Sequence, residues 1–253
     1  MTGPKILVYD VERVPNIGDF WALWKQNISP IQIHERSRTV SWAAKWYGED
    51  KILFKSEHHH GHEKMARGLI DLMDQADWVV TFNGDKFDNK HANNLIEQYQ
   101  IPRPSPYTSI DLLKVVKKNF AFESNRLSEV LDRFGLAPKL QHTGHELWLD
   151  IRGFNGETAK RRGWALMKRY NCQDVVSTEE LFERLRRWIN LPHIGMYGAE
   201  GEALGCPQCL SINIQRRGYR YTPGFAYPKY VCNDCGKWST SGKSVSRSEV
   251  RSF

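Results

Sequence analysis

The sequence predicts an α/β domain built on a mixed sheet flanked by helices, followed by a small cysteine-rich module. Short apolar runs of strand type alternate with stretches of helical apolar spacing, in the order β-β-β-α-β-α, with further helices after them. Two C-x2-C pairs occupy the C-terminal part. A chain of 253 residues with 40% hydrophobic content is long enough for one sizeable core and a small second module.

The N-terminal half starts with strands. The apolar run in KILVYDVERV, residues 5–14, predicts the first one. The Trp-rich stretch that follows, residues 20–33, has no regular period and is assigned no element. RTVSWAAKWYG and KILFKS, separated by a Gly-containing turn, predict an antiparallel hairpin beside the first strand.

Helices dominate the rest of the domain. HEKMARGLIDLMDQA predicts a helix, DWVVTF a buried strand, and a second helix runs from about Phe87 to Tyr99. PRPSPYTS reads as a loop leading into the helix IDLLKVVKKNF, with Asp111 as its N-cap. LSEVLDRFGL is a short helix ended by Gly135, and a long helical region covers 158–188 before a Gly-spotted linker.

Composition favours an intracellular protein with a polyanionic partner. The net charge of +7 and pI of about 9.1 favour a polyanionic partner. The N-terminus has no secretory pattern and no segment reaches the length of a membrane span, so we expect a cytoplasmic location. Five cysteines without a secretory signal argue against a disulfide framework, and Cys172, outside the pairs, is expected to be a buried thiol.

Two acidic residues stand at alternate positions where the apolar run of the first strand ends. Asp10 and Glu12 stand two apart, so both side chains point to one face of an extended strand. Carboxylates that close repel each other unless a cation lies between them or water separates them. By itself the pair also fits a strand that runs out into solvent.

Two later motifs carry further acids. In TFNGDKFD, residues 81–88, Asn83 follows a strand and Asp88 falls in the first turn of a helix, where an acid also complements the helix dipole. In RYNCQDVV, Tyr170 and Asp174 lie four apart on one face of the long helix. Each motif alone fits a solvated surface as well.

Together and in this order, the three motifs resemble those of the DEDD exonucleases. These form the DnaQ-like branch of the RNase H-like fold, and the match is to the type with Tyr in the third motif, as in family B polymerase proofreading domains. The resemblance covers residues 5–188. It implies that four acids hold two Mg²⁺ or Mn²⁺ ions about 4 Å apart across a scissile phosphodiester: Asp10, Glu12, Asp88 and Asp174.

The resemblance also implies roles for neighbouring residues. Tyr170 would orient the attacking water, because a protonated phenol can position but not act as a base. Asn83 would help to hold the terminal nucleotide, and Phe87 is expected in the core. Asp85 is an acidic alternative in the second motif, but the family places its Asp after Phe, which favours Asp88.

The cysteine pairs CPQC and CNDC, separated by twenty-two residues, resemble a zinc ribbon. Four thiolates at such spacing form a closed tetrahedral site for one structural Zn²⁺. The predicted ligands are Cys206, Cys209, Cys232 and Cys235.

Other patterns remain open. Phe20, Trp21 and Trp24 either stack on unpaired bases or form satellite core, and this leaves the role of the Trp-rich segment undecided. The His58–His62 cluster has no clean ligand spacing and predicts a solvated loop. The basic stretches AKRRGW and RLRRW face either a phosphate backbone or water.

These patterns together predict a two-metal 3′→5′ exonuclease that acts on single-stranded DNA and releases nucleoside monophosphates. The alternatives are an exoribonuclease with the same site and an inert nucleic-acid-binding protein. The ribbon would bind nucleic acid or a replication or repair protein. Expected domain bounds are 1–192 for the exonuclease domain, 193–204 for a linker, 205–240 for the ribbon and 241–253 for a flexible basic tail.

Overall fold

The computed structural model describes residues 4–137, 144–189, 205–222 and 224–247. The chain divides into two compact units, one formed by Lys5–Phe182 and the other by residues 1–4 together with the part from Glu183 onward. The expected linker, 193–204, and residues 248–253 of the expected tail lie outside the described residues, so the domain bounds stay predictions. No helix in the described ranges is long and apolar enough to span a membrane.

The first unit is built on a five-stranded mixed sheet in the order β5-β4-β1-β6-β7. β4 pairs antiparallel with both β1 and β5, which confirms the predicted hairpin, and β6 runs parallel to β1 and β7. The short β7 was not expected, because its first two residues fall in the predicted loop and its last two in the start of the predicted helix. The strands are β1 (Ile6–Val14), β4 (Arg38–Trp46), β5 (Ile52–Ser56), β6 (Trp78–Thr81) and β7 (Thr108–Asp111).

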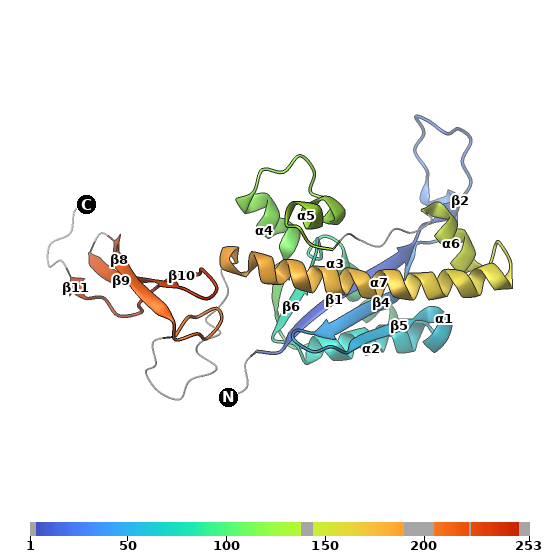
Figure 1. Cartoon of the computed structure of the whole chain (residues 1–253). Coiled ribbons are helices and arrows are strands. Elements are labelled where there is room, and N and C mark those ends of the chain that lie inside the picture. The colour runs from blue at the N-terminus through green and yellow to red at the C-terminus, as the bar shows by residue number, and fades with distance from the viewer. Residues whose placement is uncertain (1–3, 138–143, 190–204, 223, 248–253) are drawn as a thin grey trace. The chain divides into compact units, whose positions relative to one another are not determined.

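Helices cover both faces of this sheet (Figure 1). Alternate β1 residues Leu7, Tyr9 and Val11 pack in one buried cluster with α2 (His62–Asp74) and α3 (Asp88–Tyr99). Val14 packs on the opposite side, in a cluster with residues of α6 (His145–Arg152) and α7 (Glu157–Leu185). The period-two alternation of β1 therefore sends its even-numbered residues toward α7.

Helix α7 is fixed to the sheet by polar as well as apolar contacts. Lys45 on β4 forms an ion pair with Glu179 on α7, and both side chains are largely buried. Glu179 also accepts a hydrogen bond from the Gly48 backbone amide at 3.0 Å. The predicted long helix is confirmed, and a short 3-10 turn, Arg186–Trp188, follows it. The α7 residues that face the core therefore hold a set position over β1.

The smaller helices show where the sequence patterns succeed and fail. Asp111 caps α4 (Leu112–Asn119), its carboxylate accepting from the Leu113 amide, as predicted. α5 (Leu127–Arg133) precedes Gly135. The predicted His-rich loop is wrong, because His58–His60 lie in the one-turn helix α1 (Glu57–His60), which is capped by the Ser56 side chain. These three histidines are nonetheless exposed.

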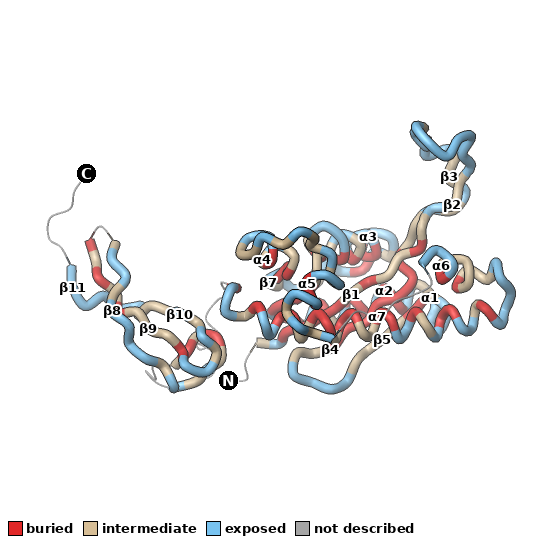
Figure 2. Tube along the Cα trace, turned by 45° about the horizontal axis from the view of Figure 1, so that its top comes forward, coloured by how far each residue is buried: buried red, intermediate tan, exposed pale blue. Residues whose placement is uncertain are grey.

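The Trp-rich segment forms a protruding arm, defined as residues 17–35. Its base is a two-stranded ribbon of β2 (Ile17–Gly18) and β3 (Ile33–Glu35), and Pro30–Gln32 forms a 3-10 turn. Figure 2 shows the arm extending from the end of β1, with its outer part exposed. Trp21 is 93% and Trp24 is 82% exposed. The satellite-core alternative for these aromatic residues is therefore wrong.

The second unit contains a small antiparallel sheet. β9 (Phe225–Cys232) pairs with β8 (Ile214–Thr222), β10 (Trp238–Thr240) and β11 (Ser246–Arg247). The loop before β8 carries Cys206 and Cys209, and the end of β9 and the turn after it carry Cys232 and Cys235. This sheet and its cysteines are consistent with the predicted ribbon.

Candidate active site

Three of the predicted acids meet between β1 and α7. Asp10 and Glu12 lie on the face of β1 that is turned to α7, and Asp174 is a buried residue of that helix. One carboxylate oxygen from each of the three lies within 4.8 Å of the others. Such close carboxylates repel each other unless a proton or a cation intervenes. An all-oxygen set of this kind suits a hard divalent cation such as Mg²⁺ or Mn²⁺.

A buried amide that the sequence reasoning missed fixes Asp10. The Asn171 side chain donates from Nδ2 to Asp10 Oδ2 at 2.7 Å and accepts from the Ser41 hydroxyl at 3.1 Å. Asn171 is fully buried. The available signal was its spacing, since a residue three before Asp174 shares that helix face.

A β-bulge places Ser41 for this contact. β1 and β4 pair Glu12 with Ser41 and then Arg13 with Thr39, so Val40 is the extra residue on β4. Val40 packs in the cluster with α6 and α7, and the adjacent Ser41 contacts Asn171 of α7. The bulge therefore lets two consecutive residues face the same helix.

Asp88 lies at the start of α3, next to this cluster but outside the group of three. Its Oδ1 accepts a hydrogen bond from the Val11 amide at 3.0 Å, and the residue is 2% exposed. Burial raises the pKa of Asp88 to about 7, and the charges of Asp111 and Asp174 add to the effect. A nearby cation would favour the ionised form of this buried carboxyl group, so Asp88 is suited to bind a metal ion.

Asp85 is engaged elsewhere. It pairs with Lys114 at 2.5 Å and accepts from the Ser109 hydroxyl at 2.6 Å. Burial acts to raise the pKa of Asp85, but the hydrogen bonds from Lys114 and Ser109 outweigh it and lower the pKa. These bonds favour Asp88 as the acid of the second motif.

The turn before α3 has a constrained backbone. Asn83 adopts a left-handed conformation with φ of 69°, and its amide donates to Asp111 Oδ1 at 2.8 Å. A Cβ on Gly84 would lie 2.0 Å from the Thr81 hydroxyl oxygen, so only glycine fits there. Phe87 was expected in the core, but it is 38% exposed and packs edge-on against His91. It is the residue just before α3, at the N-cap position, and the core prediction for it is wrong.

Tyr170 shares the α7 face that carries Asp174. It precedes Asp174 by one helical turn and is 8% exposed.

Cys172, on the same helix, is half-buried. Burial raises the pKa of its thiol, and the positive charge of Lys168 opposes this. The thiol is therefore less buried than expected.

The four predicted zinc ligands come together in the second unit. Their four Sγ atoms lie within 4.8 Å of one another. The Sγ–Sγ distance is 3.6 Å for Cys206 and Cys235 and also 3.6 Å for Cys209 and Cys232. Sulfurs on a tetrahedral zinc, with Zn–S bonds of about 2.3 Å, lie about 3.8 Å apart. The cluster therefore fits one zinc ion.

Comparison with known families identifies the superfamily of the first unit. The sequence profile RNase_H_2 of the RNase_H superfamily matches residues 37–186. The chain belongs to the RNase H superfamily. The predicted RNase H-like fold is thus confirmed, and superfamily members are typically metal-dependent nucleases. The matched span includes Asp88 and Asp174, whereas Asp10, Glu12 and the cysteine cluster lie outside it.

Solved structures show the same fold. The family B DNA polymerase from the hyperthermophilic archaeon Pyrobaculum calidifontis matches with a TM-score of 0.54 and 19% sequence identity. The match covers 74% of this chain and 25% of the polymerase chain, so this RNase H superfamily protein spans a quarter of the polymerase's length. No curated protein sequence matches it significantly.

Proposed function

We propose that the protein is a metal-dependent 3′→5′ exonuclease that hydrolyses single-stranded DNA to nucleoside monophosphates. The observation that carries the proposal is the convergence of Asp10, Glu12 and Asp174 within 4.8 Å on an RNase H-like sheet. The order of the motifs, which resembles the DEDD exonucleases with Tyr in the third motif, supplies the direction and the type of cleavage.

Four acids would hold two Mg²⁺ or Mn²⁺ ions. Asp10 and Glu12 offer oxygens from β1 and Asp174 offers one from α7, while Asp88 lies beside them at the start of α3. Bound there, the ions would supply an activated water and stabilise the leaving 3′ oxygen. Burial of Asp88 and Asp174 supports the assignment, because buried carboxylates need a charge partner.

The remaining residues of the site act by positioning. Asn171 holds Asp10 through its 2.7 Å hydrogen bond, which sets the direction of the metal-binding oxygens. Tyr170 orients the attacking water through its hydroxyl, and Asn83 holds the terminal nucleotide at the turn before α3. These two roles rest on the family resemblance.

The second unit would serve as a zinc ribbon that binds nucleic acid. Arg216, Arg217 and Arg220 are exposed on β8, and Tyr221 is 75% exposed beside them. Cations interleaved with exposed aromatic rings suit a phosphate backbone with unpaired bases. Docking of a replication or repair protein is the competing role for this surface.

A direct assay tests the activity. 5′-labelled DNA and RNA, single-stranded and duplex, should be incubated with Mg²⁺ or Mn²⁺, and we expect single-stranded DNA to shorten stepwise from its 3′ end. Asp174→Asn should nearly abolish cleavage, while Asp85→Ala, an acid outside the cluster, should retain it. Faster trimming of RNA would reassign the substrate, and an inert wild-type protein with either metal would refute the nuclease.

A further inference from the structure

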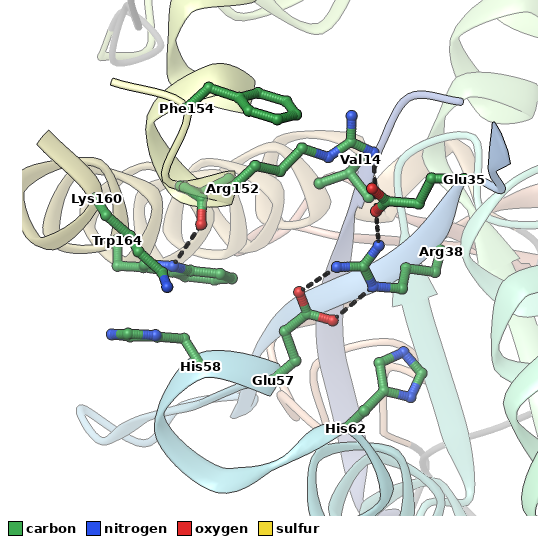
Figure 3. A pocket seen from close by; sticks show the side chains of 11 residues that line it. Val14, Glu35, Arg38, Glu57, His58, His62, Arg152, Phe154, Lys160 and Trp164 are labelled. Carbon is green, nitrogen blue, oxygen red and sulfur yellow. Dashed lines mark hydrogen bonds and ion pairs between the residues drawn. The ribbon is translucent and has the colours of Figure 1, made fainter. Parts of the chain in front are cut away.

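Apart from the carboxylate site, a polar pocket lies at the C-terminal end of β1, between α1, α6 and α7. It has a volume of about 480 Å³. Figure 3 shows its lining residues. We call it the Arg152 pocket, and define it by Arg38, Glu57, Arg152, Phe154, Lys160 and Trp164. It gathers parts of three sequence patterns that the carboxylate site leaves unused: the His cluster, the AKRRGW stretch and the base of the arm.

The charges of the Arg152 pocket leave a positive excess. Arg38 donates to both carboxylate oxygens of Glu57, each at 2.8 Å, and also pairs with Glu35. Glu35 is shared with Arg152 at 3.4 Å. Lys160 has the exposed Glu157 at 3.6 Å as its ion-pair partner. Two lining carboxylates thus face three lining cations. The third acid, Glu157, lies outside the lining and is 80% exposed, so water screens its charge and the lining keeps a positive excess that favours an anionic ligand.

Arg152 carries an unsatisfied donor. Its side chain is 7% exposed, and Nη2 donates to the Pro15 carbonyl at 2.6 Å. Its Nε is buried and has no hydrogen-bond partner among the described residues. A buried N–H without an acceptor is costly, and a phosphate oxygen would satisfy it once the side chain turned Nε into the pocket.

The pocket also has flat aromatic surfaces. Trp164 is 2% exposed, fixed by its indole N–H bond to the Ile151 carbonyl at 3.1 Å. The His58 ring lies parallel to it, with centroids 5.2 Å apart. Phe154 is 62% exposed, so its ring is accessible for stacking. Cations beside an accessible aromatic ring are the features that bind an unpaired nucleotide.

The pocket shares its supporting elements with the carboxylate cluster. Val14 lies on β1 beyond Asp10 and Glu12, and Trp164 precedes Asp174 by ten residues of α7. At 1.5 Å per helical residue this separation is about 15 Å. One DNA strand advances about 3.4 Å per nucleotide in a duplex, so the distance corresponds to about four nucleotides or fewer.

We propose that the Arg152 pocket binds one nucleotide of the substrate strand, upstream of the 3′ end held at the carboxylates. Its phosphate contacts Arg152 and Lys160, and its base stacks on Phe154. The identity of the strand rests on the proposed exonuclease function, but binding at the pocket is measurable without cleavage.

The test measures binding of fluorescent single-stranded DNA to the full chain without added divalent cation. Phe154→Ala and Lys160→Gln should each weaken binding of a strand of about 12 nucleotides by about 5- to 50-fold. Lys160→Gln should also reduce the slope of log affinity against log salt by about 0.7. Phe154→Trp, which keeps the ring, should retain affinity, and Lys118→Gln on the exposed face of α4 is the matched charge control.

Strand length separates this pocket from the carboxylate site. A dinucleotide is too short to reach both places, so any of its binding that Phe154→Ala and Lys160→Gln weaken takes place at the pocket itself. Equal affinity of all proteins for the long strand, or an unchanged salt slope in Lys160→Gln, would overturn the proposal. The proposal would also be overturned if Phe154→Ala and Lys160→Gln weakened the binding of free nucleoside monophosphate but not the binding of the strand.

The outcomes distinguish this proposal from the nuclease itself. Pocket-dependent strand binding by a protein that never cleaves supports the pocket and refutes the exonuclease. Stepwise cleavage with no effect of Phe154→Ala or Lys160→Gln on strand binding refutes the pocket and leaves the exonuclease intact.

Discussion

Replacing Asp88 by Asn should stabilise the metal-free protein at alkaline pH. The ordinary pKa of 3.8 is raised to about 7 in the folded state, mainly by burial. A raised pKa means that the folded state binds the proton of Asp88 more tightly than the unfolded state does. The protonated group therefore contributes its full share of folding stability below pH 3.8, and this share is lost as the pH rises to about 7. Since each pKa unit is worth about 1.4 kcal/mol, this loss is at most about 4 kcal/mol.

Asn keeps the contact while removing the charge. Its side-chain oxygen can accept the 3.0 Å hydrogen bond from the Val11 amide, so the variant is nearly isosteric. Relative to wild type, Asp88→Asn should therefore gain stability steadily between about pH 4 and pH 8. The variant should at the same time be inactive if Asp88 holds a catalytic ion.

Urea unfolding followed by far-ultraviolet circular dichroism measures the effect. The experiment compares both proteins at about pH 5 and pH 8 without Mg²⁺ or Mn²⁺, with the zinc site left as purified. Adding Mn²⁺ at pH 8 should stabilise wild type more than the variant, because the ion binds the ionised acid. An identical pH dependence in the two proteins would refute the raised pKa, and an equal Mn²⁺ effect would refute metal binding by Asp88.

Three further outcomes are expected. Tyr170→Phe should lower kcat by about 10- to 100-fold and leave KM almost unchanged, in steady-state cleavage assays; a raised KM with normal kcat would make Tyr170 a packing or stacking residue. Asn171→Ala should raise the Mn²⁺ concentration needed for half-maximal cleavage by about 10- to 100-fold, whereas Asn171→Asp should not restore it. Metal analysis of protein purified without chelator should find about one zinc per chain, and its absence would exclude the ribbon site.

The parts of the fold with a strong period were predictable from sequence. Apolar residues at helical spacing predicted α2 and α7, and alternation placed Asp10 and Glu12 on one face of β1. The four-residue strand β7 has two exposed residues at its start, so it carries no recognisable alternation. Tertiary pairing with β6, which sequence cannot show, makes it a strand.

The site was predictable at its charged residues and less so at its supports. Acids that follow an apolar run or begin a helix stand out in a sequence, as Asp10 and Asp88 do. Asn171 does not, because its importance depends on Ser41, 130 positions away, and on the bulge at Val40 that directs Ser41 to α7. Likewise the cations of the Arg152 pocket come from β4, α6 and α7, and meet only in the folded chain.

The protruding arm has a consequence for how this protein can evolve. Trp21 and Trp24, almost wholly exposed, contribute little apolar burial to the fold. Substitutions at such positions usually change folding stability by less than about 0.5 kcal/mol. Natural selection can therefore alter the tip of the arm without approaching the stability threshold that constrains the sheet. The sequence of the arm is therefore free to diverge with little effect on the stability of the sheet that carries the carboxylates.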